Sequence, residues 1–67
     1  MTRVTLNGRS REVSGESTVE NLIRAMHLDP RFVIVERNGE PLARARYADV
    51  RVADGDRLEF VRAVAGG

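Results

Sequence analysis

The chain ends in two glycines, and its last five residues carry almost no side-chain bulk. Ala63, Val64 and Ala65 precede Gly66 and Gly67. Without a Cβ, a diglycine adopts backbone angles closed to other residues and passes through a narrow channel. When extended, this five-residue segment reaches roughly 17 Å, enough to enter a partner's buried site while the rest of the chain stays outside. We therefore expect the main-chain carboxylate of Gly67 to be the reactive group.

A terminal carboxylate needs activation before it reacts, because it is ionised at neutral pH and is a poor electrophile. Attack of the Gly67 carboxylate on the α-phosphate of ATP would give an acyl-adenylate, whose leaving group a sulfur nucleophile displaces. The partner would hold ATP and Mg²⁺ and stabilise the developing charge, while this chain supplies the acyl group. We therefore expect a protein co-substrate that is not an enzyme, with no catalytic residue, metal or cofactor of its own.

Other side chains offer weaker chemistry. His27 is the single histidine, and a tetrahedral metal site normally needs several ligands at set spacing, so we assign it no role. Ser17, His27 and Asp29 have the residue types of a catalytic triad, but a serine at a helix cap uses its hydroxyl on backbone N–H groups. Asp54 and Asp56 lack the further oxygen ligands of a calcium loop, and we expect a turn there.

Length and composition exclude several classes of protein. The 67 residues allow one small domain, whose core is too small to enclose a substrate-sized pocket. The chain has no cysteine, and its 11 basic residues, all arginine, nearly balance 10 acidic ones, which argues against nucleic acid as the main partner. The absence of lysine removes any side-chain amine that accepts an isopeptide bond. With no apolar run near the roughly 20 residues of a membrane span and no signal peptide, we expect a cytoplasmic protein without membrane contact.

The first half of the chain predicts a hairpin and a helix. Alternating residues at 3–6 and 9–13 flank Asn7-Gly8, the favoured pair for a type I′ turn. Apolar residues then follow helical spacing at Val19, Leu22, Ile23 and Met26. Ser17 with Glu20 fits a capping box, although Thr18 is an alternative N-cap. The helix should end near residues 27–28, because a residue before proline avoids the α region.

The second half predicts three strands. Residues 32–35 form an apolar β-branched run, Asn38-Gly39 supplies a second tight turn, and residues 40–42 suit a short edge strand that tolerates Pro41. Tyr47 and Val50 are expected to turn inward beneath a loop or one helical turn. A turn at 54–56 then leads into a last strand at 57–61. One amphipathic helix covers one sheet face, which gives a two-layer α+β domain over residues 1–62 and a flexible diglycine tail at 63–67.

Together these motifs resemble a known family. The Asn38-Gly39 turn, the ADGDRLE stretch at 53–59 and the RAVAGG ending at 62–67 follow one another as in the ThiS family, the bacterial sulfur carriers of thiamine biosynthesis. ThiS belongs to the ThiS/MoaD-type ubiquitin-like superfamily. The likeness spans essentially the whole chain, and its specificity lies in the order of short motifs. It implies a β-grasp fold, with a mixed sheet of four to five strands packed on one α-helix and the first and last strands adjacent and parallel.

The resemblance also implies a set of partners. A ThiF-like adenylyltransferase would adenylate Gly67, and a persulfide sulfur from a donor protein would replace one oxygen to give a thiocarboxylate. A ThiG-like thiazole synthase would then receive the sulfur for the thiazole ring of thiamine.

Related functions remain open at this stage. The ending Val64-Ala65-Gly66-Gly67 is also common in the small subunit of molybdopterin synthase, which uses the same terminal chemistry. That relative usually has a longer chain and a proline pair where this sequence has Arg62-Ala63, so length and the Asn7-Gly8 hairpin favour the thiamine carrier. Sulfur carriers for cysteine synthesis or transfer-RNA thiolation share the ending. A ubiquitin-like protein modifier and a plain adaptor that binds through its sheet are the alternatives from other classes.

A partner must also dock beside the reactive end. The sheet surface near the tail, where Phe60 or Val61 faces outward beside Arg62, is the expected contact, because an interface needs an apolar centre. The opposing hypothesis is that Phe60 and Val61 both fill the core.

Overall fold

Two tight turns with the same residue pair shape the sheet. Asn7 and Gly8 have φ of 50° and 82°, and Asn38 and Gly39 have φ of 53° and 84°. A type I′ hairpin needs positive φ at both central positions, which asparagine and glycine tolerate. The first turn joins β1 (Thr2–Leu6) to β2 (Arg9–Val13), and the second joins β3 (Val33–Arg37) to β4 (Glu40–Leu42). Both predicted hairpins are confirmed.

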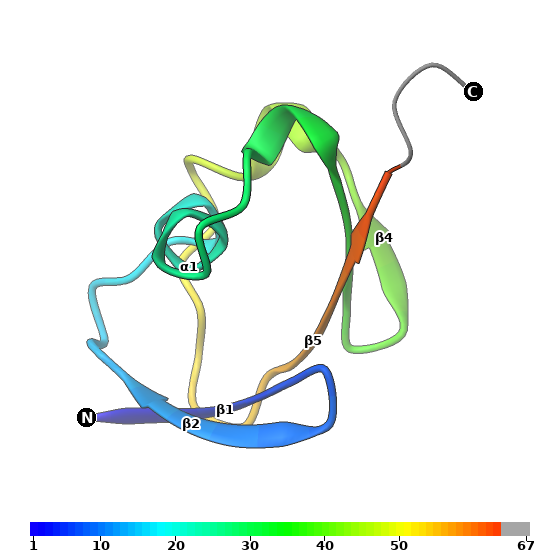
Figure 1. Ribbon diagram of the computed structural model, residues 1–67. Helices are drawn as coiled ribbons and strands as arrows, with labels where there is room; N and C mark the ends of the chain where they lie inside the picture. Colours follow the sequence, from blue (N-terminus) through cyan, green and yellow to red (C-terminus); the bar gives the residue numbers. More distant parts are fainter. Residues whose placement is uncertain (64–67) are drawn as a thin grey trace.

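The computed structural model describes residues 1–63 and places the last strand in the middle of the sheet. The five strands lie in the order β2-β1-β5-β3-β4, with β5 (Arg57–Arg62) at the centre (Figure 1). β5 pairs parallel with β1 and antiparallel with β3. Pro41 lies in the edge strand β4, where its missing N–H interrupts no interior ladder. This is the mixed five-stranded sheet of a β-grasp fold, as predicted.

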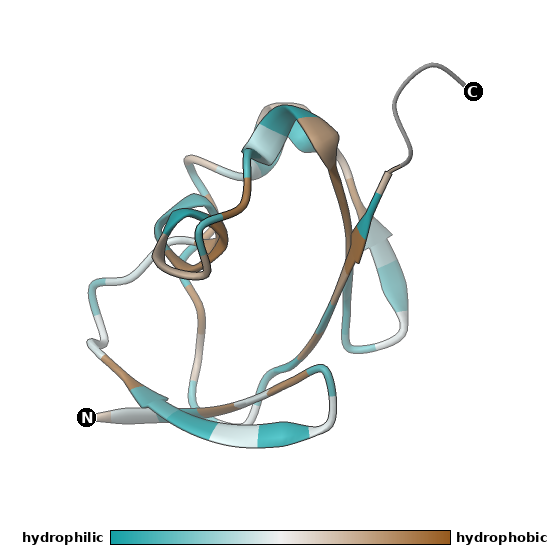
Figure 2. Ribbon diagram, viewed as in Figure 1, coloured by the Kyte–Doolittle hydropathy of each residue, from teal (hydrophilic) through white to brown (hydrophobic). Residues whose placement is uncertain are grey.

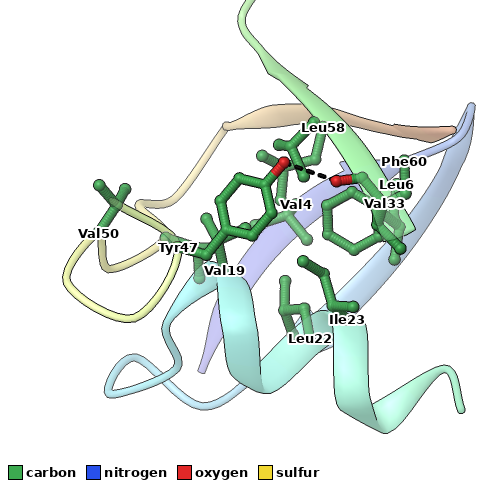
Figure 3. Packing of buried hydrophobic residues seen from close by; sticks show 12 residues of the cluster. Val4, Leu6, Val19, Leu22, Ile23, Val33, Tyr47, Val50, Leu58 and Phe60 are labelled. Atoms are coloured by element: carbon green, nitrogen blue, oxygen red, sulfur yellow. Dashed lines mark hydrogen bonds between the residues drawn. The ribbon is translucent and has the colours of Figure 1, made fainter. Parts of the chain in front are cut away.

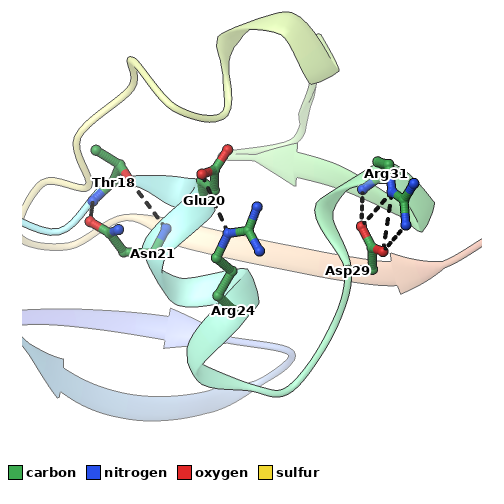
Figure 4. Close-up of polar contacts among 6 residues, drawn as sticks. All are labelled: Thr18, Glu20, Asn21, Arg24, Asp29 and Arg31. Atoms are coloured by element: carbon green, nitrogen blue, oxygen red, sulfur yellow. Dashed lines mark hydrogen bonds and ion pairs between the residues drawn. The ribbon is translucent and has the colours of Figure 1, made fainter.

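The helix α1 (Val19–Ala25) begins with a reciprocal capping pair. The Asn21 amide donates to Thr18 Oγ1 at 3.1 Å, and the Thr18 amide donates to Asn21 Oδ1 at 2.9 Å (Figure 4). The expected pairing of Ser17 with Glu20 is therefore wrong, and the alternative cap at Thr18 is confirmed. The physical reason is position, because Thr18 has extended backbone directly before the first helical residue.

A left-handed residue just beyond the C-cap closes the end of α1. His27 has φ of 61°, and the Leu28 amide reaches back to the Ile23 carbonyl at 3.1 Å, which closes the last turn. A 3₁₀ turn, η1 (Pro30–Phe32), follows and leads into β3. Phe32, predicted as the first residue of the strand, belongs to this turn instead. The α-helix ends at Ala25 with Met26 as its C-cap, two residues before the predicted end near residues 27–28, because His27 leaves the helical conformation.

The core lies between α1 and one face of the sheet (Figures 2 and 3). Its buried apolar members are Val4, Leu6, Val19, Leu22, Ile23, Val33, Val35, Tyr47, Val50, Val52, Leu58 and Phe60. Along β5 the side chains alternate, so that Leu58 and Phe60 face α1 while Val61 faces away. No helix within residues 1–63 is long and apolar enough to cross a bilayer.

Tyr47 closes one end of this core, as predicted together with Val50. It follows the 3₁₀ turn η2 (Arg44–Arg46) and is 3% exposed. Its hydroxyl donates to the Val33 carbonyl at 2.7 Å (Figure 3). This bond ties the irregular segment after β4 to the first residue of β3.

Removing the Tyr47 hydroxyl should weaken the fold without leaving a large cavity. We expect Tyr47→Phe to lower the free energy of unfolding by about 1 to 2 kcal/mol, because the Val33 carbonyl loses its buried donor. Urea unfolding followed by circular dichroism measures this change. An unchanged midpoint would show that this bond adds nothing to stability.

Candidate functional site

The start of β5 is fixed by one buried carboxylate. Asp56 is 5% exposed and accepts three hydrogen bonds. The donors are the Ala53 amide at 2.8 Å, Arg37 Nε at 3.0 Å and Asn38 Nδ2 at 3.1 Å. Asp56 therefore joins the β3–β4 turn to the loop that enters β5. In the predicted turn at 54–56, the neighbouring Asp54 accepts from the Arg3 amide at 2.8 Å.

The contacts of Asp56 also set its protonation. Burial acts to raise the pKa of this carboxyl, but the Ala53 amide, the Asn38 amide group and the Arg37 guanidinium together outweigh burial and hold the pKa below its ordinary value. Asp56 is consequently ionised at neutral pH. The aspartates at 54 and 56 thus serve the geometry of the turn.

Farther along β5, the Asn7 side chain makes the hydrogen bonds that β1 no longer supplies. The Phe60 amide donates to Asn7 Oδ1 at 2.8 Å, and Asn7 Nδ2 donates to the Phe60 carbonyl at 3.3 Å. The Asn7 amide itself donates to the Leu58 carbonyl at 2.9 Å. The hairpin asparagine thus extends the pairing of β1 with β5 by one step. This role, which needs both a donor and an acceptor, was not predicted from the sequence.

At the end of β5 the chain is still bonded to the domain. The Ala63 amide donates to the Phe32 carbonyl at 2.6 Å. Ala63, the first residue of the expected tail at 63–67, is therefore still hydrogen-bonded to the expected domain at 1–62. Val64, Ala65, Gly66 and Gly67 lie outside the described residues, and their entry into a partner's site stays a prediction. Extended, those four residues span at most about 14 Å.

The exposed surface beside the tail differs from the predicted one. Phe60 is 6% exposed and packs in the core, so its assignment to a docking surface is wrong, because its position in the strand alternation faces α1. Val61 and Arg62 are exposed, and Val61 lies opposite Ile34 on β3. Val61 is 56% exposed and Ile34 51% exposed. We call Ile34 and Val61 the outer apolar pair.

Ile34 is absent from the predicted docking surface, because the apolar run at 32–35 predicts a strand without showing which of its side chains face outward. A period of two along that run separates the buried Val33 and Val35 from Ile34, and pairing with β5 then brings Ile34 to Val61. Phe32 is also partly exposed, with the Arg31 guanidinium 5.2 Å from its ring centre. Apolar surface thus gathers near the point where the chain leaves the domain.

The residues considered for a catalytic triad do not assemble one. His27 and Asp29 border a small hollow at the end of α1, together with Arg62. The Asp29 carboxylate accepts from Arg31 Nη2 at 2.7 Å, and hydrogen bonds from Arg31 lower its pKa to about 2 (Figure 4). Ser17 lies before the other end of the helix. Within residues 1–63, no three histidine, aspartate or glutamate side chains are placed to hold a metal ion.

Comparison with known proteins decides the family. The model of the ThiS family matches residues 4–67, which includes the last strand and the diglycine. The chain belongs to the ThiS family. It is 36% identical over 63 residues to the sulfur carrier protein ThiS of Bacillus subtilis, across 92% of this chain and 96% of that protein. The crystal structure of the thiamine biosynthesis protein ThiS from Geobacter metallireducens superposes with a TM-score of 0.81 at 33% identity, covering 98% of this chain and all of that one.

The chain also matches larger proteins. It is 43% identical over 65 residues to the thiazole synthase of Paramagnetospirillum magneticum and 31% identical over 65 residues to that of Magnetococcus marinus. These matches cover 97% of this chain but only 20% of each thiazole synthase. Two proteins with that name therefore contain a segment similar to this ThiS-family chain.

The carboxylate that fixes β5 gives a pH-dependent prediction. We expect Asp56→Asn to lower the free energy of unfolding at pH 7 by about 2 kcal/mol, because it removes the charged acceptor of three hydrogen bonds. The folded state depresses the pKa of Asp56, so its contribution is complete above the ordinary aspartate pKa and is lost as the pH falls through the lower folded value.

Urea titrations of the parent and of Asp56→Asn between neutral and strongly acidic pH measure this effect. The difference between the two proteins should be constant near neutrality and should shrink in acid. A difference that is independent of pH down to the acid limit of folding would contradict the assignment.

Proposed function

We propose that this chain is a sulfur carrier protein of thiamine biosynthesis, a co-substrate that carries sulfur as a thiocarboxylate on Gly67. The observation that carries the proposal is the ThiS-family match, which runs to the final glycine. The curated relative of nearly equal length is a sulfur carrier protein ThiS. The match to segments of thiazole synthases supports the thiamine pathway over the molybdopterin alternative.

The proposed chemistry takes place on the terminal carboxylate in a partner's active site. One oxygen of the Gly67 carboxylate attacks the α-phosphate of ATP, which a ThiF-like adenylyltransferase holds with Mg²⁺, and pyrophosphate leaves. The terminal sulfur of a donor protein's persulfide then displaces AMP, which gives an acyl disulfide between Gly67 and the donor. A thiol reduces that S–S bond with two electrons, and the sulfur stays on Gly67 as a thiocarboxylate. Thiazole synthase then receives this sulfur.

The described residues support a role as the substrate in this scheme. β5 is bonded on both sides, by β1 with Asn7 and by β3, so the root of the tail has a fixed position and direction. The last such bond, from the Ala63 amide to the Phe32 carbonyl, lies four residues before the reactive end. A short segment on a rigid root reduces the entropy lost when a partner positions the carboxylate.

The docking surface is proposed to centre on the outer apolar pair, Ile34 and Val61. The next cross-strand pair on the same face is Glu36 opposite Glu59, and both are exposed. Like charges directly opposite one another destabilise a sheet, so a partner's cation beside the apolar contact would relieve a cost present in the free protein. We therefore expect a partner surface with an apolar centre bordered by arginine or lysine.

Mass spectrometry of the protein from its own cells tests the central step. We expect a population in which one oxygen is replaced by sulfur, located on Gly67 by fragmentation. Oxidation of a methionine adds nearly the same mass as replacement of oxygen by sulfur, and the chain has two methionines. The mass change must therefore be located on the terminal residue. Deletion of Gly67 should abolish both the modified species and growth without the thiazole moiety.

The alternatives give different outcomes in the same experiment. Covalent adducts of the chain with other proteins would indicate a protein modifier. Loss of molybdenum-enzyme activity on gene deletion, with thiazole synthesis intact, would indicate a molybdopterin synthase subunit. Unchanged growth after deletion of Gly67 would leave only the adaptor hypothesis.

Adjacent residues on β5 provide matched variants for the docking surface. We expect Val61→Ala to raise the KM of the adenylyltransferase for the carrier about fivefold or more, with the free energy of unfolding changed by less than about 0.5 kcal/mol. Phe60→Ala should instead destabilise the fold by about 3 to 5 kcal/mol, because it empties a core position. Steady-state pyrophosphate release and urea unfolding separate the two effects. A Val61→Ala carrier with parent KM would remove Val61 from the interface.

A further inference from the structure

The hydrogen bonds along β5 alternate between its two neighbours. Toward β3, the Arg57 carbonyl accepts from the Asn38 amide at 2.7 Å, and the Ala63 amide donates to the Phe32 carbonyl at 2.6 Å. In an antiparallel ladder, a residue exchanges both of its main-chain bonds with the same neighbouring strand, and the next residue faces the other side. The odd-numbered residues of β5 therefore face β3.

The even-numbered residues face β1. The Asp56 carbonyl accepts from the Thr5 amide and the Leu58 carbonyl from the Asn7 amide, both at 2.9 Å. At Phe60 the strand β1 has already ended, and the Asn7 side chain takes both main-chain groups instead.

Arg62 is the next even-numbered residue of β5, and neither β1 nor the Asn7 side chain reaches it. The pairing of β1 with β5 ends at Leu6 and Leu58, and the Asn7-Gly8 turn carries the chain back into β2. Within residues 1–63, the structure gives no hydrogen-bond partner on this side to the Arg62 amide or carbonyl. These two main-chain groups are directed to the side of β5 where β1 has ended, and no residue among 1–63 pairs with them there; we call this the open position. Arg62 as a whole is exposed.

We propose that this open position binds an extended main-chain segment of the protein that charges Gly67, which pairs with Arg62 as an added strand. The inference rests on the proposed sulfur-carrier function. An added strand satisfies the free donor and acceptor together, which is the way extended peptides bind a sheet edge. Its residue on the outer face packs beside Val61, and this contact joins the edge to the outer apolar pair.

Pairing at Arg62 does more than add affinity, because it sets the register of the reactive end. Gly67 is five residues beyond Arg62, and an extended chain advances about 3.3 Å per residue. A strand bonded at Arg62 therefore fixes how far the carboxylate reaches, and a slip of one residue would move it by about 3.3 Å, far more than a reacting geometry tolerates. The apolar surface alone does not supply such a register.

Two substitutions at one position separate the main chain from the side chain. Arg62→Pro removes the amide hydrogen and places the proline ring at the open position, while the bonds to β3, made by residues 61 and 63, are retained. Arg62→Ala keeps the amide and removes only the guanidinium. We expect the KM for adenylation by the ThiF-like adenylyltransferase to be about three- to tenfold higher for Arg62→Pro than for Arg62→Ala. Equal KM values for the two folded variants would overturn the proposal.

Hydrogen exchange in the unmodified full chain tests the same bond if Arg62→Pro fails to fold. We expect exchange of the Arg62 amide to slow by about tenfold or more when the adenylyltransferase is saturating, with amides of the exposed edge strand β2 unchanged. An Arg62 amide that exchanges equally fast in the complex would refute the added strand. The parent chain is a control for the underlying function: if the enzyme releases no pyrophosphate with it, the sulfur-carrier proposal fails, whereas adenylation without Arg62 protection refutes only the strand pairing.

Discussion

The structure depends on one constraint, which is that the last strand of the chain occupies the centre of the sheet. β5 pairs with β1 on one side and β3 on the other, and its inward side chains Leu58 and Phe60 lie in the core. A strand bonded along both edges cannot tilt or slide without breaking two ladders. The direction in which the chain leaves the domain is therefore set by the most constrained element of the fold. The chemistry proposed for Gly67 needs such a fixed exit, because a partner must position the terminal carboxylate.

Asparagine and aspartate side chains supply hydrogen bonds at the start of this central strand and at Phe60, beyond the end of β1. Asp56 fixes its start by binding Arg37, Asn38 and the Ala53 amide, and Asn7 pairs with Phe60 after β1 has ended. Asn7 therefore has two roles, since its backbone also adopts the positive φ of the hairpin turn. The polar turn residues of this small domain are thus part of its sheet.

Local sequence patterns predicted most of the fold. The Asn-Gly pairs, the helical spacing of apolar residues and the alternation at 57–61 fix elements because each depends on neighbours within a few residues. The reactivity of Gly67 was inferred from the last five residues and stays a prediction. The predicted outward facing of Phe60 is wrong, and the exposure of Ile34 was not predicted, because both depend on which strands pair and in what register. The two hydrogen bonds between Asn7 and Phe60 join residues 53 positions apart, and no local pattern signals them.

The central position of β5 also has a consequence for folding during synthesis. A ribosome releases β5 after β1 and β3, so both strands must wait for their shared neighbour during synthesis. A truncated product that stops before Arg57 lacks the middle of its sheet and has no route to this fold. The complete sheet thus forms only on chains that extend through β5, so the topology makes folding wait for the residues that directly precede the glycines.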